Sequence, residues 1–466
     1  MNLSKLKMLG AVVFASIMLE AFYASATPDR QNRSNETGSQ PTPVLALCPA
    51  DAAWISDPTL PAEVGGDSFC DFYQFSWKAF YYLMSPSAAD PSIRNFEDTS
   101  RFPVLLDQDS CEPTSPGKHT VYVRTTKQND NTPDFTLPQA INQAGAGSTI
   151  YDQNGHVVYY SMSFSRDLCT KAASATPQQG NLPENAIELK FAWRVLNPVE
   201  VSEFVTIDAT IFEPGAANPS TYKLGLVGFH MALSTPNHPE MVWASFEHHR
   251  NAPNCTLPDN PTATAWSFTS PSCAACLATP TDTCVRDTCA FNTAPNNATA
   301  ITGKPTEICR LYPTGTAPED HMAETNINVI NTLNAQLTGT DGLVAKSVVE
   351  ASPKAVLANY RMLGAQWLKD PSIGSNPTLG QASNQRGSLV LENPVMETTF
   401  QGEMPFVEHG VLAAVMGNQS GATNCFTCHE YTPGNTATVT ESSNRNGLSH
   451  IYGEIINQIK LTEDEN

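Results

Sequence analysis

A series of short segments between residues 118 and 250, in which polar and apolar side chains alternate, constrains the fold of this chain most strongly. An Asn154-Gly155 turn signal precedes one of them. Many short strands at close spacing are typical of an all-β sandwich or barrel. We therefore predict a mainly β body, a sandwich or distorted barrel, with a few helices. The predicted strands are 121–126, 157–160, 186–193, 204–212, 222–231 and 241–246.

Two segments have the spacing of helices instead. Residues 68–84 carry aromatic side chains on so many sides that we predict a buried helix. Residues 325–337 place their apolar side chains close to helical spacing. Strand-like patterns return at 355–368 and 388–392.

The N-terminus has the three parts of a secretory signal. Lys5 and Lys7 precede a mostly apolar stretch at 8–22, and Ala24-Ser25-Ala26 forms a small-residue cleavage site. We predict cleavage between Ala26 and Thr27 and export to the bacterial periplasm or beyond. No other apolar run approaches the roughly 18 residues that a membrane-spanning helix needs, so we predict no integral membrane segment.

The cysteine content agrees with an oxidising compartment. The chain has 12 cysteines, and six of them lie between residues 251 and 318. Setting aside the two in the motif described next leaves an even number, for which we predict up to five disulfides. The alternative to disulfides is a zinc site formed by Cys273, Cys276, Cys284 and Cys289, although the spacing of these cysteines departs from that of a zinc ribbon. The six are Cys255, Cys273, Cys276, Cys284, Cys289 and Cys309.

Near the C-terminus stands the pentapeptide Cys425-Phe426-Thr427-Cys428-His429. C-x-x-C-H is the attachment motif of c-type haem. Two thiols on one helical turn reach the two vinyl groups of one haem, and the adjacent histidine supplies the proximal nitrogen to the iron. We predict one covalent haem c held by Cys425 and Cys428, with His429 as the proximal ligand.

The distal ligand is open between several residues. His450 is the only histidine downstream of the motif, and no methionine follows it. Met416 and Met396 are the upstream methionine candidates, and Met404 and His409 are weaker ones. An iron without a protein ligand on this side is the remaining alternative, and it permits chemistry with peroxide, oxygen or nitric oxide. A methionine in place of a second histidine raises the reduction potential.

A second constellation lies on two neighbouring predicted strands. His230 and His248 can meet across a hairpin and bind copper or another metal. The alternative is that these histidines are core and surface residues without a metal.

These observations divide the chain into four parts. We predict a signal peptide at 1–26, a flexible leader at 27–47, a β-rich body at 48–390 and a haem c-binding segment at 391–466. The Cys-rich residues 251–318 form an insertion within the body.

Taken together, the motifs resemble those of exported bacterial mono-haem proteins of the cytochrome c family, a group without a characterised substrate. The resemblance implies a large β-rich body with a haem segment at its C-terminus. The stretch 402–424 before the cysteine pair is longer here than in that family. The residues that carry the resemblance are 75–80, 187–193, 228–230, 243–248, 360–367, 396–398 and the C-x-x-C-H motif.

The leading functional hypothesis is an exported mono-haem cytochrome that transfers single electrons. The formal net charge of −20 opposes nucleic-acid binding and favours a redox partner with a basic docking face. One alternative is a haem-dependent oxidoreductase with an open iron or a second metal site on the β body. Another is a ligand-binding β module to which the haem is a tether.

Overall fold

The chain divides into two units, Met1–Thr42 and Pro43–Asn466, and every described residue belongs to the second. The computed structural model describes residues 48–103, 121–122, 149–172, 183–211, 220–255, 265–293, 301–317, 320–349, 351–375, 380–398, 406–408, 411–413, 425–429, 431 and 448–449. The predicted signal peptide and leader, and most of the predicted haem segment, lie outside these residues.

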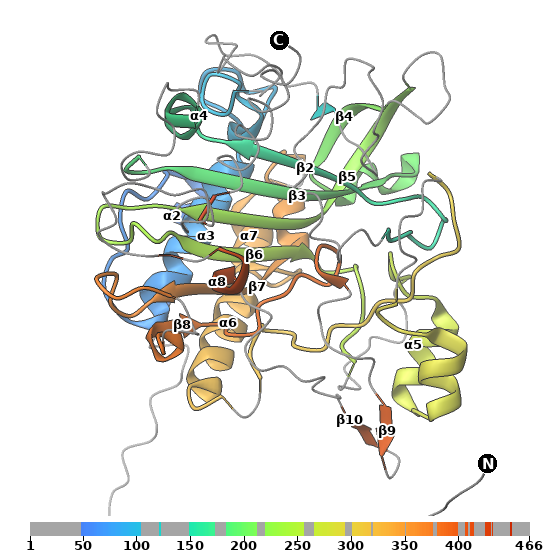
Figure 1. Ribbon diagram of the computed structural model, residues 1–466. Coiled ribbons are helices and arrows are strands. Elements are labelled where there is room, and N and C mark those ends of the chain that lie inside the picture. Colours follow the sequence, from blue (N-terminus) through green and yellow to red (C-terminus); the bar gives the residue numbers. More distant parts are fainter. Residues whose placement is uncertain are drawn as a thin grey trace, which may run out of the picture. The chain divides into compact units, whose positions relative to one another are not determined.

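One eight-stranded sheet organises the described structure (Figure 1). Its strand order runs β1-β4-β5-β6-β7-β8, with β3 on the other edge of β5 and β2 beyond β3. All pairs are antiparallel except β1 with β4, which is parallel. The strands are β1 (Val121–Tyr122), β2 (Tyr159–Phe164), β3 (Ile187–Val195), β4 (Thr206–Ile211), β5 (Ser220–Leu233), β6 (Val242–His248), β7 (Tyr360–Leu368) and β8 (Gln385–Gly387).

The 14-residue strand β5 is shared by three neighbours. On one edge it pairs with β3 from residue 224 to residue 233. On the other edge its first half pairs with β4 and its second half with β6. The sheet therefore branches at β5.

Helices α3 (Phe69–Met84) and α6 (Ala323–Leu337) lie behind the sheet in Figure 1. Helix α3 begins at a capping box, in which the Ser68 side chain accepts from the Asp71 amide and the Asp71 carboxylate accepts from the Ser68 amide. Its aromatic residues face the sheet: Phe80 stacks on Phe246 of β6 at 4.4 Å between ring centroids, and Phe72 stacks on Trp367 of β7 at 4.1 Å. This layer of rings between helix and sheet is called the inner core below.

The Cys-rich segment is fastened by disulfides, as predicted. Cys273–Cys289 and Cys276–Cys284 join α5 (Pro271–Ala278) to the π-helix η4 (Thr283–Cys289). Cys255–Cys309 closes the segment at its base, and Cys48–Cys70 ties the start of the body to α3. Cys169 is also disulfide-bonded.

The remaining elements are short. They are α2 (Ala53–Ser56), η1 (Asn95–Glu97), α4 (Arg166–Ala172), η3 (Pro198–Glu203), α7 (Leu343–Ser347), η5 (Ala355–Asn359), η7 (Ala382–Asn384), β9 (Phe406–Glu408), β10 (Val411–Ala413) and α8 (Cys425–Cys428). No helix among the described residues is both long and apolar enough to cross a bilayer.

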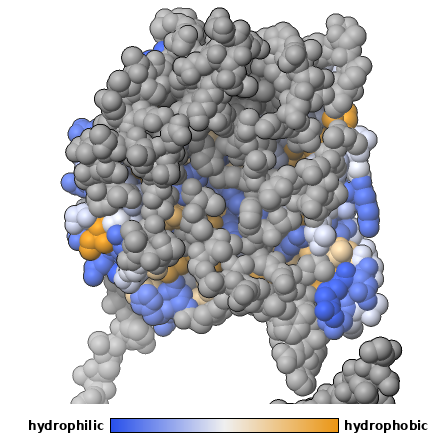
Figure 2. Space-filling view, in the orientation of Figure 1, coloured by the Kyte–Doolittle hydropathy of each residue, from blue (hydrophilic) through white to orange (hydrophobic). Residues whose placement is uncertain are grey.

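In the view of Figure 2 the coloured surface is mostly hydrophilic. The large apolar side chains exposed on the described surface are Val199, Val349 and Ile373, and they come from three different parts of the chain. Isolated apolar residues of this kind are normal on a protein surface.

The prediction of a mainly β body with a few helices is confirmed, but the layering differs from the expected sandwich. The described residues form one large sheet with the long helices α3 and α6 packed on one face, and a separate two-stranded sheet of β9 and β10. The prediction of a strand at 388–392 is wrong, because the described strand there is β8, at Gln385–Gly387.

Candidate functional site

The C-x-x-C-H motif lies against the face of the sheet that points away from α3, which we call the outer face (Figure 1). Its first four residues form α8, and the His429 amide donates to the Cys425 carbonyl at 2.8 Å, which continues the helical turn. The Cys425 amide donates to Gln366 Oε1 of β7 at 2.9 Å. Backbone geometry thus places Cys425, Cys428 and His429 on one turn beside the sheet.

The motif packs against a cluster of apolar side chains on this face, which we call the outer cluster. Phe426 is almost wholly buried in it, and the half-buried Cys425 packs against it. Full burial of an aromatic side chain removes a large apolar area from water and stabilises this position. The outer cluster consists of Met162, Phe164, Leu168, Cys169, Ala186, Ala232, Met241, Trp243, Leu368, Phe426 and Leu448.

The His429 imidazole is 3 % exposed and lies between an aromatic ring and a cation. Its ring centroid is 4.2 Å from that of Trp243, with 34° between the planes. Its Nε2 atom is 3.2 Å from Nζ of Lys190 on β3. Trp243 and Lys190 thus both contact the imidazole.

A buried chain of polar groups extends from this contact. Lys190 Nζ is 3.3 Å from Glu188 Oε1, and the Ser449 hydroxyl donates to Glu188 Oε2 at 2.7 Å. The Lys190 and Glu188 side chains are 7 % and 1 % exposed. Buried charges need partners of this kind, because an uncompensated one is costly. Residues 449 and 429 therefore meet β3 through one ionic network.

Next to Lys190 in the sheet register lies His230 of β5, and next to His230 lies Ser245 of β6. His230 Nε2 is 2.8 Å and 3.0 Å from the two carboxylate oxygens of Glu397. Asn393 donates to the Ser245 hydroxyl at 3.2 Å. The segment 393–397 therefore covers the outer face beside the C-x-x-C-H motif.

The donor set of the motif fits a c-type haem in the residues that are described. Cys425 belongs to none of the described disulfides, and the Nε2 atom of the buried His429 lies 3.2 Å from Lys190 Nζ. The apolar outer cluster surrounds both residues. The Cys428 side chain lies outside the described residues. Coordination through Nε2 requires the Lys190 ammonium to move from its present position.

Of the predicted distal ligands, Met396 is the one that is described. It is buried beside Gly228 of β5, where an added Cβ would lie 3.0 Å from Met396 Cγ. It packs with Val395 in a cluster separate from the outer cluster. His450 and Met416, and also Met404 and His409, lie outside the described residues.

The predicted metal pair of His230 and His248 is not assembled. Phe229 and Phe246 face the inner core, so His230 on β5 points to the outer face, whereas His248 on β6 packs beside Tyr360 on the inner side. His248 stacks on Phe204 at 4.0 Å, and its Nε2 lies 3.1 Å from the Glu203 carbonyl oxygen. Burial holds the pKa of His248 well below its usual value.

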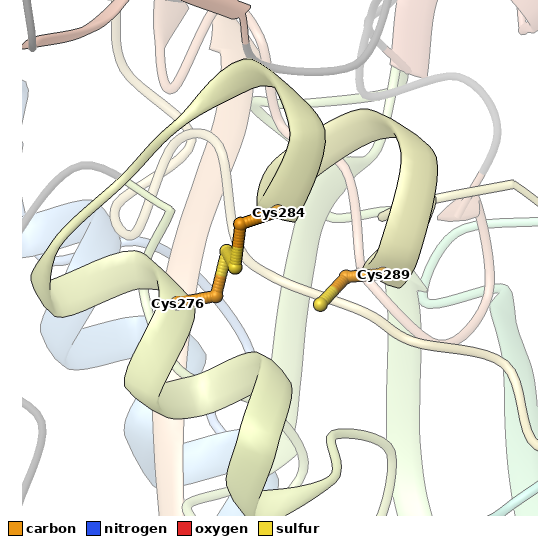
Figure 3. A group of neighbouring side chains, drawn as sticks. All are labelled: Cys276, Cys284 and Cys289. Atoms are coloured by element: carbon orange, nitrogen blue, oxygen red, sulfur yellow. A yellow bond between two sulfur atoms is a disulfide. The ribbon is translucent and has the colours of Figure 1, made fainter.

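The cysteines considered for zinc are close together but oxidised. The sulfurs of Cys276, Cys284 and Cys289 lie within 4.8 Å of one another (Figure 3). Cys284 is bonded to Cys276 and Cys289 to Cys273, so none of these sulfurs is a thiolate available to a metal. The disulfide prediction is confirmed for these four residues.

Sequence reasoning did not single out Glu188, Lys190 or Trp243. Glu188 and Lys190 stand at alternate positions of β3, in a segment whose alternation predicts a half-buried strand. The available signal was weak, since a strand pattern does not say what covers its polar face.

The chain matches no family model, no curated protein and no solved structure.

Proposed function

We propose that this protein is an exported c-type mono-haem cytochrome that transfers single electrons. The observation that carries the proposal is the burial of the C-x-x-C-H turn against the outer face, with His429 enclosed by Trp243 and Lys190. A motif that occurs by chance is not expected to pack against an apolar cluster and a buried ion pair. The disulfides agree with the oxidising compartment in which such proteins mature.

In this proposal the residues of the motif have distinct tasks. The thiols of Cys425 and Cys428 would hold the group covalently, each by addition across one vinyl group with its hydrogen passing to carbon, so that no external oxidant or reductant would be needed. His429 would hold the iron through Nε2, with Trp243 packed against the imidazole ring. A bound haem c supplies an iron that alternates between ferrous and ferric states. The outer cluster excludes water, and the net negative charge of the chain favours a basic redox partner.

The test is covalent haem on the exported, matured protein. We expect one haem per chain by the pyridine haemochrome assay, and haem that stays with the chain under denaturing conditions. Cys425→Ser with Cys428→Ser should abolish it, whereas the matched pair Cys276→Ser with Cys284→Ser should keep it. Covalent haem that persists in the first variant, or its absence from the wild type, would refute the proposal.

A further inference from the structure

Two disulfides of the Cys-rich segment lie next to each other. Cys276–Cys284 and Cys273–Cys289 both join α5 to η4. The sulfur of Cys289 lies within 4.8 Å of the sulfurs of Cys276 and Cys284, and in Figure 3 its side chain points toward the bond between them. The Cys273 sulfur is not part of this close group. A thiolate released from the first disulfide therefore has one sulfur of the second as its neighbour, as thiol–disulfide exchange requires.

The four sulfurs differ in their access to solvent. Three of the four cysteines are between 3 % and 5 % exposed, whereas Cys284 is half-buried. The residues on either side of it, 281–283 and 286–288, are exposed apart from Cys284 and Val285 between them. The neighbouring Cys255–Cys309 disulfide is completely buried. Cys284 is therefore the sulfur of this segment that a thiolate in solution reaches first.

Helix α5 favours a negative charge on Cys273 over one on Cys276. The two cysteines form a C-x-x-C pair on this helix, with Cys273 in its first turn and Cys276 in its last. The Cys273 amide donates to the side chain of the N-cap residue Ser270 at 3.3 Å. A helix stabilises an anion at its N-terminus and disfavours one at its C-terminus, so a thiol near the N-terminus has a lowered pKa. Cys273 is consequently the better leaving group of the pair.

We propose that these two disulfides form a thiol–disulfide exchange site, which oxidises a pair of substrate thiols to a disulfide. A substrate thiolate attacks Cys284 and forms a mixed disulfide, and Cys276 leaves as a thiolate. Cys276 then attacks Cys289, which forms a Cys276–Cys289 disulfide and releases Cys273. The second substrate thiol displaces Cys284, so the substrate leaves as a disulfide, and its two electrons and two protons stay on Cys273 and Cys284 as two thiols.

This activity does not rest on the proposed haem function. The cluster that contains the four cysteines includes none of residues 425–429. The exchange needs no metal or cofactor, because the second disulfide of the site receives the thiolate that the first one releases.

The experiment treats the folded, matured protein with reduced glutathione, alkylates all free thiols and locates every modification by peptide mass spectrometry. We expect glutathione on Cys284, a new Cys276–Cys289 link and the alkyl label on Cys273, in roughly tenfold excess over Cys276. The matched control is Cys273→Ser with Cys289→Ser, which removes the second disulfide. In this variant the alkyl label should move to Cys276.

A wild type with glutathione on Cys284, label on Cys276 and an intact Cys273–Cys289 bond overturns the exchange, and so does a wild type in which none of the four cysteines reacts. If the control variant does not fold, the positions of label in the wild type decide. A reduced C-x-x-C peptide in place of glutathione tests the activity itself. We expect one peptide disulfide per chain and label on both Cys273 and Cys284, whereas a peptide that stays reduced rules the activity out.

Discussion

At the residue scale, the least expected feature is the ion pair Glu188–Lys190 beneath the C-x-x-C-H turn. Both residues are almost completely buried, although the polar positions of an alternating strand usually face solvent. Segments distant in sequence, through His429 and Ser449, cover them. The motif itself was predictable from five letters, but its environment was not, because tertiary cover leaves no local pattern in a strand.

Lys190→Met should destabilise the folded protein by about 3–5 kcal/mol, because it leaves the buried Glu188 carboxylate without its cationic partner. Adding Glu188→Met should recover much of this loss, since two apolar side chains replace the pair. Urea denaturation measures both free energies of unfolding. As a control, Lys223→Met removes the exposed partner of Asp208 and should cost at most about 1 kcal/mol. Equal losses for Lys190→Met and Lys223→Met would contradict this account.

His248 should make stability fall in mild acid. Its pKa is lowered on folding, so it stays neutral in the folded state while the unfolded chain takes up a proton below about pH 6.5. The contribution is therefore complete above that pH, and it declines by up to about 1.4 kcal/mol per pH unit below it. His248→Gln should flatten the pH profile of the unfolding free energy over this range. His321→Gln, at a side chain 75 % exposed, is the comparison, and indistinguishable profiles would count against a neutral buried His248.

At the element scale, most of the secondary structure follows from periodicity. Helices α3 and α6 and strands β3 to β7 lie close to the segments that the apolar pattern indicates. The layering does not follow, because alternation reports that a strand has two faces and not whether a sheet or helices pack there. The aromatic residues of α3 belong to the inner core, and this explains why its sequence is apolar on nearly every side.

Ser68→Ala should weaken α3 at its start by about 0.5–2 kcal/mol, because the Asp71 amide loses its acceptor. Ser68→Asn should be close to neutral, since asparagine caps a helix about as well as serine does and its amide can replace the serine hydroxyl as donor to the Asp71 carboxylate. Thermal or urea unfolding of the three proteins checks the prediction. An equal loss in both variants would indicate that the capping bond is not the cause.

At the scale of the whole molecule, residues 425–429 lie on the outer face of the sheet while the main core lies on its other side. The inner core contains none of residues 425–429. Folding of the body should consequently not depend on haem attachment, although the motif depends on the body for its enclosure.

The haem-free variant Cys425→Ser with Cys428→Ser should therefore keep a β-rich far-ultraviolet circular dichroism spectrum and the near-ultraviolet signal of its stacked aromatic residues. Its disulfides, including Cys48–Cys70 and Cys255–Cys309, should still form. Thiol titration of the denatured protein checks this, because a cysteine in a disulfide gives no thiol signal. Collapse of the aromatic signal would mean that haem is required to fold the body.

The branching of the sheet at β5 has a consequence for how the molecule opens. Detachment of β3, β4 or β6 alone leaves β5 held by the other two neighbours. Each amide in the middle of β5 bonds one of these neighbours, and loss of either β3 or β6 splits the centre of the sheet, so these amides should exchange only in openings close to global unfolding. In a hydrogen–deuterium exchange experiment they should be the last to take up deuterium, at a rate that reports the global unfolding equilibrium.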